Sequence, residues 1–500
     1  MRVSSFALLL TVVLTESVLA APAPAQEPAL RQGSGQASDL GPQVPIGQPR
    51  DGYVGTMRVA PVHGKAGDPF TVTAVDLPPN QEFQLIWRTV IGQWNVTESE
   101  YKGREFVPVN YEMARMRSDA AGRLQATFKT PEDFGFNHDI VLQQGDRLLT
   151  QAAYSIDMSM EVSPRSGALG TPIDIEVKGI GYRNLEMSFN LLYDNRWTGW
   201  VSAVTTSGTG RLTIPATGHV GDHVIELLHG QFGFPYRNQE QSPEPDRPRF
   251  SIPFTVTDGA PVLPPAPAAQ AQTHVRLPAP AGDLHSNPRF SGVGEQVTVT
   301  GEKFTPGERY TLNWTRVIGN RIDGGGWETR SVPVGQAVAD RDGRVSITFA
   351  TPDDLGGTHG LYIDAGGARR MGTHFVKSTA LPMNVTRGPV GTKITLHLKG
   401  VGWTETSNIM HLVYDNGYIG YACAFNSQGD VTIYMEATGA PGWHFIDLYP
   451  GIYKGTETLP INYRMPQLTY AADHPGEDLP AFRFAFEVTS PTRTTTGSQD

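Results

Sequence analysis

The stretch Leu-Leu-Tyr-Asp-Asn-Arg-Trp-Thr-Gly-Trp at residues 191–200 returns as Leu-Val-Tyr-Asp-Asn-Gly-Tyr-Ile-Gly-Tyr at residues 412–421. The two tyrosines, Tyr193 and Tyr414, are separated by 221 residues (414 − 193). Such a long pattern that recurs so far downstream indicates that the chain contains an internal duplication.

The duplication extends on both sides of this stretch. Residues 71–73 correspond to 298–300, and residues 128–131 to 349–352. The offset falls from 227 (298 − 71) to 221 (349 − 128), so the first copy has six extra residues in the loop around 94–120. Each half also repeats a glycine followed by a histidine that opens an apolar run. These pairs are Gly135 and His138, Gly221 and His223, Gly356 and His359, Gly442 and His444. We therefore expect the order A-B-spacer-A-B.

The strand pattern is that of an all-β protein. Residues 70–73, 173–177, 297–300 and 394–398 alternate apolar and polar side chains, which is the period of a half-buried strand. The chain has 55 Gly and 39 Pro but only 18% charged residues, which suits short strands joined by tight turns. We predict four tandem immunoglobulin-like β-sandwiches, because each unit has the size of one such domain.

Composition places the boundaries between these units. Residues 21–50 are rich in Pro, Ala and Gln and cannot bury enough apolar surface to fold. A second Pro/Ala stretch near the middle is typical of a semi-extended spacer. The expected segments are a signal peptide (1–20), a flexible leader (21–50), A1 (51–158), B1 (159–258), the spacer (259–275), A2 (276–378), B2 (379–489) and a disordered tail (490–500).

The openings of the B units resemble a known family. Residues 163–182 carry a Pro and two glycines before a strand that ends in Gly-Ile-Gly-Tyr, and residues 386–403 repeat this arrangement. Residues 294–304 are a weaker version, and residues 74–77 depart from it. This pattern resembles bacterial immunoglobulin-like domains of the IPT/TIG kind. The resemblance implies binding, adhesion or spacing rather than one activity.

The N-terminus predicts export. Arg2 precedes an apolar run over residues 6–14, and Val18-Leu19-Ala20 supplies the small residues of a cleavage site. No later segment is long and apolar enough for a membrane anchor. Cys423 is the only cysteine, so no internal disulfide is possible. The net charge of −10 includes no basic stripe, so we expect no nucleic-acid partner. We predict a secreted or periplasmic protein without a transmembrane anchor.

Two recurring motifs could bind metal or could serve the fold. The four histidines sit at the same place in four separate units, which favours a structural hydrogen bond at a strand entrance over a shared metal. The acidic turns at residues 131–133 and 352–354 could help to hold Ca²⁺, which needs six or more oxygen ligands. Without a further Asp ladder, we favour turns whose Asp caps backbone amides. We expect no metal and no cofactor.

The Tyr-Asp-Asn hairpins carry the candidate ligand-binding residues. Asn416-Gly417 predicts a tight turn, and outward aromatics beside Asp and Asn would suit a sugar ring or a protein partner. The alternative is that these rings fill the sandwich core. The candidates are Tyr193, Asp194, Asn195, Trp197, Trp200, Tyr414, Asp415, Asn416, Tyr418 and Tyr421.

No catalytic motif is apparent. The sequence has no Gly-x-Ser-x-Gly elbow, no His-Glu-x-x-His and no phosphate loop. Our leading hypothesis is a non-catalytic binding, adhesion or structural protein whose partner is an extracellular protein or a polysaccharide. The alternatives are a carbohydrate-binding protein that uses the hairpins, and a hydrolase with its site between A and B units, so enzymatic activity is left open. Two halves joined by a spacer also predict bivalent binding.

Overall fold

The computed structural model describes residues 31–32, 52–97, 100–183, 186–187, 189–231, 234–238, 247–271, 282–319, 327–404, 406–424, 427–452, 465–476 and 478–490. The predicted signal peptide, nearly all of the predicted leader, residues 272–275 of the predicted spacer and nearly all of the predicted tail lie outside the described residues.

The chain is an all-β protein built from repeated sandwiches, as the sequence predicts. In each sandwich a three-stranded sheet packs on a larger sheet. In A1 the small sheet is β2 (Thr56–Ala60), β4 (Pro69–Val75) and β7 (Leu124–Lys129). The large sheet runs β6 (Glu100–Arg117), β5 (Glu82–Thr97), β8 (Phe136–Gln144), β9 (Arg147–Ile156) and β3 (His63–Gly64), with β1 (Arg31–Gln32) paired to β6.

A2 repeats this topology. Its small sheet is β19 (Leu284–Asn287), β21 (Gln296–Gly301) and β24 (Val345–Ala350). Its large sheet runs β20 (Phe290–Ser291), β26 (Ala368–Val376), β25 (Gly357–Ala365), β22 (Arg309–Gly319) and β23 (Trp327–Val338). The β5–β6 hairpin of A1 is longer than its A2 counterpart β22–β23, with strands of 16 and 18 residues against 11 and 12. The extra residues of the first copy therefore lengthen this hairpin.

The B units share a second version of the same plan. In B1 the small sheet is β10 (Ser159–Ser163), β12 (Pro172–Lys178) and β15 (Gly210–Pro215). The large sheet runs β11 (Ser166–Gly167), β18 (Phe250–Val256), β16 (Gly221–Gln231), β13 (Phe189–Tyr193) and β14 (Arg196–Val201), and β17 (Phe234–Pro235) pairs with β16.

In B2 the corresponding small sheet is β27 (Thr379–Ala380), β29 (Lys393–Lys399) and β32 (Val431–Glu436). The large sheet runs β28 (Arg387–Gly388), β34 (Phe482–Val488), β33 (Gly442–Pro450), β30 (Ile409–Tyr414) and β31 (Gly417–Cys423). The offset between the B units rises from 221 at the start of β33 (442 − 221) to 232 at the start of β34 (482 − 250). The connection between β33 and β34 therefore carries an insertion in B2.

The cores follow from the alternation of the strands. In β4, Phe70, Val72 and Ala74 point inward, and their neighbours lie toward solvent. Trp87 and Trp314 hold the same place in A1 and A2 and are fully buried. The core of B1 also includes Leu468 of B2, so the two B units share apolar packing. Burial of apolar surface from both units stabilises the contact between B1 and B2.

The stretch that recurs forms the β13–β14 and β30–β31 hairpins. Tyr193 pairs with Arg196, and Tyr414 pairs with Gly417, so each turn has two central residues, Asp followed by Asn. All four have positive φ, between 46° and 64°, which is the type I′ geometry of two-residue hairpins. The predicted Asn416-Gly417 turn is therefore wrong by one residue. Asp and Asn tolerate this conformation, and Gly417 begins β31.

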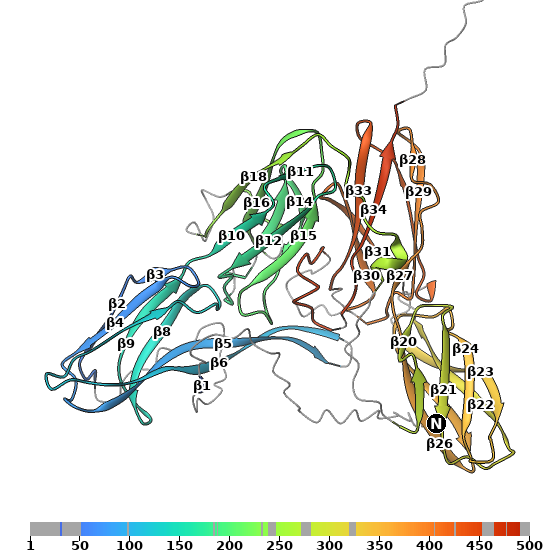
Figure 1. The fold of residues 1–500 in the computed structure, drawn as a ribbon, viewed down its shortest axis with the longest axis horizontal. Helices are drawn as coiled ribbons and strands as arrows, with labels where there is room; N and C mark the ends of the chain where they lie inside the picture. The colour runs from blue at the N-terminus through green and yellow to red at the C-terminus, as the bar shows by residue number, and fades with distance from the viewer. Residues whose placement is uncertain are drawn as a thin grey trace, which may run out of the picture.

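The four sandwiches form an arch, with A1 and A2 at its two ends and B1 beside B2 at its top (Figure 1). Strands β14 and β31 are neighbours across the two halves. The β5–β6 hairpin extends from A1 toward the middle of the arch (Figure 1). Among the described residues no helix has the length and apolar character needed to cross a membrane.

Candidate functional site

The four recurring histidines have the same structural role. In each unit, histidine Nε2 donates to the backbone carbonyl oxygen four residues earlier, at 2.7–2.8 Å; the pairs are His138 with Phe134, His223 with His219, His359 with Leu355 and His444 with Ala440. Each ring stacks on an aromatic ring of a neighbouring strand, with centroids 4.5–5.6 Å apart. The histidines close a turn at the strand entrance, as expected.

In the B units, the hairpin aspartate completes this network. Asp415 accepts from His444 Nδ1 at 2.5 Å and from the backbone amide of Phe445 at 2.9 Å. Asp194 does the same with His223 and Val224. Burial lowers the pKa of His444, but the hydrogen bond and charge of Asp415 outweigh it and leave that pKa raised. The aspartate of the Tyr-Asp motif therefore links the hairpin turn to the neighbouring strand of the same sheet, which is β16 in B1 and β33 in B2.

The acidic turns build the junction between each A unit and its B unit. Glu132 receives the ammonium of Lys178 at 3.2 Å, and Asp353 receives that of Lys399 at 2.7 Å, at equivalent positions in the two halves. The neighbouring Asp133 and Asp354 are buried and accept from the indole N–H of Trp87 and Trp314 at 2.8 and 2.9 Å. Among the described residues there is no group of three or more potential ligands that could hold a metal ion. These carboxylates are engaged by the protein itself.

The two hairpins meet each other at the top of the arch. Trp197 and Tyr418, which are equivalent residues, contact edge to face with centroids 5.4 Å apart. Thr198 donates to the carbonyl oxygen of Asn416 at 2.7 Å, and the Asn416 amide donates to the carbonyl oxygen of Pro215 at 2.8 Å. The contact is asymmetric, because Asn195, the counterpart of Asn416, is exposed. The duplicated stretch therefore joins B1 to B2.

The ten candidate residues differ in exposure for this reason. Tyr193, Trp200, Asp415 and Asn416 are buried, whereas Asp194, Trp197, Tyr414 and Tyr418 are partly buried. Asn195 is exposed, and Tyr421 is exposed by 44%. The structure brings Trp197, Tyr418 and Asn416 together, and it places Tyr421 further along β31. Tyr421 is the one aromatic of this set that presents much of its ring to solvent.

The B2 insertion forms a second connection, which we call the clasp (residues 465–476). It adds to the edge strand β14, because Trp200 N–H donates to Pro466 and Leu468 N–H donates back to Trp200, at 2.8 and 2.9 Å. Further along the clasp, Asp473 is buried and accepts from the amides of Val204 and Thr205, both at 2.8 Å. These bonds extend the B1 sheet with a segment of B2.

Asp473 also binds the long hairpin of A1. The indole N–H of Trp94, near the tip of the β5–β6 hairpin, donates to Asp473 Oδ1 at 3.0 Å. Around it, Tyr101 of A1, Trp200 of B1 and Met465 of the clasp form a buried apolar cluster. Three sandwiches therefore meet at one carboxylate.

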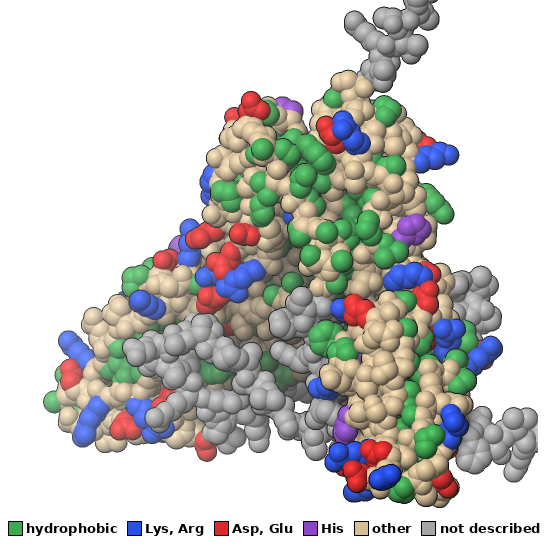
Figure 2. Space-filling model, turned by 45° about the vertical axis from the view of Figure 1, so that its right-hand side comes forward, with side chains coloured by type: hydrophobic (Ala, Val, Ile, Leu, Met, Phe, Trp, Pro, Cys, Tyr) green, Lys and Arg blue, Asp and Glu red, His purple; other side chains and the backbone are tan. Residues whose placement is uncertain are grey.

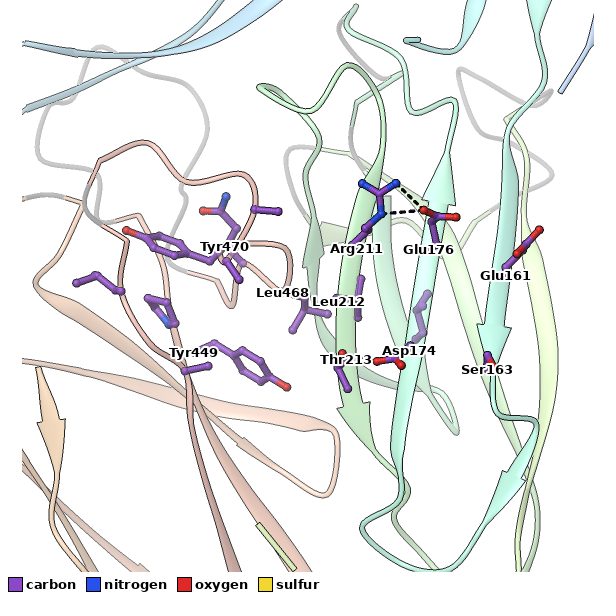
Figure 3. Close-up of a pocket in the computed structure, with 17 residues that line it drawn as sticks. Glu161, Ser163, Asp174, Glu176, Arg211, Leu212, Thr213, Tyr449, Leu468 and Tyr470 are labelled. Carbon is purple, nitrogen blue, oxygen red and sulfur yellow. Dashed lines mark hydrogen bonds and ion pairs between the residues drawn. The ribbon is translucent and has the colours of Figure 1, made fainter. Parts of the chain in front are cut away.

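A groove of about 570 Å³ lies between B1 and the clasp (Figure 3). One wall is the outer face of the small B1 sheet, with Glu161, Asp174, Glu176 and Arg211. The other wall comes from B2, with Leu468, Tyr470 and Leu479 among its residues. In the space-filling view, hydrophobic side chains gather over the upper part of the molecule, where B1 and B2 lie (Figure 2). The groove exists only because the two halves fold together.

Sequence reasoning missed this groove. Its walls come from residues 161–213 and 449–481, and no local motif links them. The one available signal was the longer connection between β33 and β34 in B2, which breaks the constant offset of the duplication.

Comparisons with known proteins add little to this picture. No protein-family model matches the sequence, and no curated protein matches it. A Salmonella alpha-2-macroglobulin structure aligns with 10% identity and a TM-score of 0.18 over 88% of this chain and 31% of that one, so this chain spans less than a third of that protein. An ICAM-5 D1-D4 ectodomain fragment aligns with 12% identity and a TM-score of 0.16, over 83% of this chain and 98% of that one.

A putative membrane anchored protein from Corynebacterium diphtheriae aligns with 11% identity and a TM-score of 0.17, over 87% of this chain and 92% of that one. We draw no function from likenesses at this level. The class that the fold defines is a tandem array of immunoglobulin-like β-sandwiches.

Proposed function

We propose that this protein is a secreted, non-catalytic binding or adhesion protein of the cell surface or envelope, and that its ligand lies in the groove between B1 and the clasp. The observation that carries the proposal is the groove itself, which is lined by both halves of the duplication. Concave sites lined by apolar residues with a few polar groups are the usual ligand sites of proteins. The IPT/TIG-like openings of the B units are consistent with a binding role.

The groove is held in place before a ligand arrives. The backbone bonds between Trp200 and residues 466–468 and three hydrogen bonds that Asp473 accepts from Val204 and Thr205 fix the clasp against B1. A fourth, from Trp94, ties it to A1. A preorganised site loses less conformational entropy on binding, so more of the contact energy appears as affinity. This rigidity suits a binding module.

One serine–histidine pair among the described residues has the spacing of a hydrolytic site, but its burial favours a binding role for the protein over hydrolysis. Ser291 and His374 lie 2.7 Å apart between Oγ and Nε2, which is the spacing of a nucleophile and its base. Both are buried in A2, with exposed fractions of 0% and 1%, and a substrate cannot reach them. The Ser291 hydroxyl also hydrogen-bonds the Thr351 hydroxyl at 2.6 Å, so these three side chains form a buried polar network inside A2.

A pull-down from the envelope and culture medium of the source organism tests the proposal. The groove variant is Ser163→Trp, which places a large ring on an exposed position of the B1 wall. Its matched control is Thr432→Trp, at an exposed position on the small sheet of B2. We expect the wild type and the control to retain the same ligand and the groove variant to lose it. Retention by all three would contradict the groove as the site.

A second candidate ligand, which is also an alternative from the sequence, is a polysaccharide that stacks on the hairpin aromatics. The observation in its favour is Tyr421 on β31, a residue that is 44% exposed. Glycan-array binding that disappears in Tyr421→Ala but persists in Ser163→Trp would support this candidate over the groove.

A further inference from the structure

The B1 wall of the groove is acidic. Glu161 of β10 lies directly opposite Glu176 of β12, and Ser163 lies opposite Asp174. Like charges placed directly opposite on neighbouring strands destabilise a sheet. Three carboxylates thus share one face. Glu176 is paired with Arg211 at 2.7 Å and with Lys178 at 3.4 Å, so Glu161 and Asp174 are the two that a ligand of opposite charge would neutralise.

Arg211 is the one cation among the described residues that line the groove, and it does not neutralise this wall. Arg211 binds Glu176 at 2.7 Å (Figure 3). Its guanidinium also lies 3.3 Å from the carboxylate of Glu132. Asp174 accepts a hydrogen bond from the Thr213 hydroxyl at 2.7 Å. Within the described part of the chain, no Lys, Arg or His pairs with Glu161 or Asp174. The wall therefore presents net negative charge to the groove.

The opposite wall is apolar, and its described residues offer no exposed aromatic face. Its exposed side chains are Ala471, Ala472 and Ala481. Leu468 and Leu479 also line it, with exposed fractions of 6% and 5%. Tyr449 and Tyr470 also contribute, but they are exposed by only 6% and 2%. A sugar ring stacks on an exposed aromatic face, and these two rings are covered. The apolar wall suits aliphatic side chains instead.

We propose that the groove binds an extended peptide segment of a partner protein, in which basic and apolar side chains alternate. This inference rests on the proposed function and specifies its ligand. An extended peptide points successive side chains to opposite sides. Lys or Arg at alternate positions then faces Glu161 and Asp174. The apolar residues between them pack on the exposed alanines Ala471, Ala472 and Ala481 of the opposite wall. Charge complementarity fixes the orientation and speeds association.

The test measures binding of labelled peptides to the full chain by fluorescence anisotropy. The probe is a soluble decapeptide that alternates Lys with Val. Two matched peptides replace every Lys with Glu or every Val with Ser. We expect only the Lys/Val peptide to bind, and we expect its binding to weaken as salt is raised, because the contacting charges are exposed.

Charge variants locate the site. Glu161→Gln combined with Asp174→Asn removes two exposed carboxylates, and we expect the affinity to fall about three- to tenfold. Glu436→Gln on β32 is the matched control, since it removes an exposed carboxylate from the small sheet of B2. Unchanged affinity in the double variant, or equal binding of the Glu/Val peptide, overturns the inference.

The same experiment separates this inference from the proposed function. Chito- and cello-oligosaccharides added as competitors should leave the peptide bound. If an oligosaccharide binds and Ser163→Trp abolishes that binding, the groove is a binding site but the peptide inference is wrong. If neither peptides nor oligosaccharides bind, and Ser163→Trp leaves the pull-down unchanged, both proposals fail.

Discussion

Gly135 and Gly356 lie at the A–B junctions, where the next sandwich leaves no room for a Cβ atom. A Cβ on Gly135 would lie 1.7 Å from the carbonyl oxygen of Gly179, and a Cβ on Gly356 would lie 2.0 Å from that of Gly400. Both glycines donate their amide to the next sandwich, at 3.1 and 3.0 Å. The sequence showed these glycines as repeated positions, but close approach to another unit could not be deduced from it.

Gly356→Ala should therefore loosen the A2–B2 junction. The added methyl meets backbone, which cannot rotate away, so we expect a loss of about 1–3 kcal/mol in stability. The matched control is Gly360→Ala, whose Cβ would meet the Thr315 hydroxyl at 3.0 Å. Denaturant unfolding of both variants measures the difference. Equal stability of the two variants would show that the backbone contact is absent.

The buried pair Ser291 and His374 predicts a pH dependence of A2. Burial, and then the charge of His359, lower the pKa of His374 to about 4 from the usual histidine value of 6.5. Because the folded pKa is depressed, this histidine's contribution to stability is fully present above about pH 6.5. It is lost as the pH falls through 6.5 toward 4, by about 3 kcal/mol in all.

A1 supplies the control for this prediction. There, Gly64 and Tyr154 take the places of Ser291 and His374, and the Tyr154 hydroxyl bonds to Thr130 at 2.6 Å. Ser291→Gly combined with His374→Tyr copies this arrangement into A2. Thermal unfolding between pH 7 and 4 should become less pH-dependent in the double variant than in the wild type. Parallel curves for the two proteins would contradict the prediction.

At the scale of elements, the hairpins were found in the sequence, but their environment was not. The repeated Tyr-Asp-Asn stretch predicted two hairpins, which are β13–β14 and β30–β31, and the turn predicted at Asn416-Gly417 lies one residue earlier, at Asp415-Asn416. The exposure of Trp197 and Tyr418 depended on which hairpin lies opposite, and that is set by the packing of B1 on B2. A strand pattern encodes an inward and an outward face, but it does not reveal what covers the outward face.

Trp197→Ala tests this packing. Its ring contacts Tyr418 and Phe234, and its indole N–H donates to Asn190 at 2.9 Å. We expect a loss of about 2–3 kcal/mol, toward the lower end for truncation of a large aromatic, because the ring is only partly buried. Differential scanning calorimetry of the full chain measures it, with Ile419→Ala, an exposed neighbour on β31, as control. A hairpin whose ring served only a ligand would unfold unchanged.

At the scale of the whole molecule, the departures from the duplication matter as much as the duplication. The first half has extra residues in the β5–β6 hairpin, and the second half has extra residues before β34. These two insertions contact each other through Trp94 and Asp473. The lengths of the insertions follow from the offsets in the sequence. The contact between them could not be predicted, because it depends on how A1, B1 and B2 pack.

The described part of the predicted spacer also belongs to this assembly. Val262 N–H donates to Leu169 of B1 at 2.8 Å. Gln270, at the end of η2 (Pro267–Gln270), bonds to the backbone of Arg483 in B2 through both its amide and its carbonyl oxygen, at 2.7 and 2.6 Å. We therefore expect that a shorter spacer would strain the packing of B1 on B2, rather than change only the reach between two independent sites.

Hydrogen exchange of the Trp200 and Leu468 backbone amides tests the union of the two halves most directly. Each amide donates across the β14–clasp contact, so both should exchange slowly in the full-length wild type. Asp473→Ala leaves the amides of Val204 and Thr205 without their acceptor, so both Trp200 and Leu468 should then exchange faster together. Rapid exchange of Leu468 in the wild-type chain, with β14 protected only by its own sheet, would show that the clasp and its groove do not form.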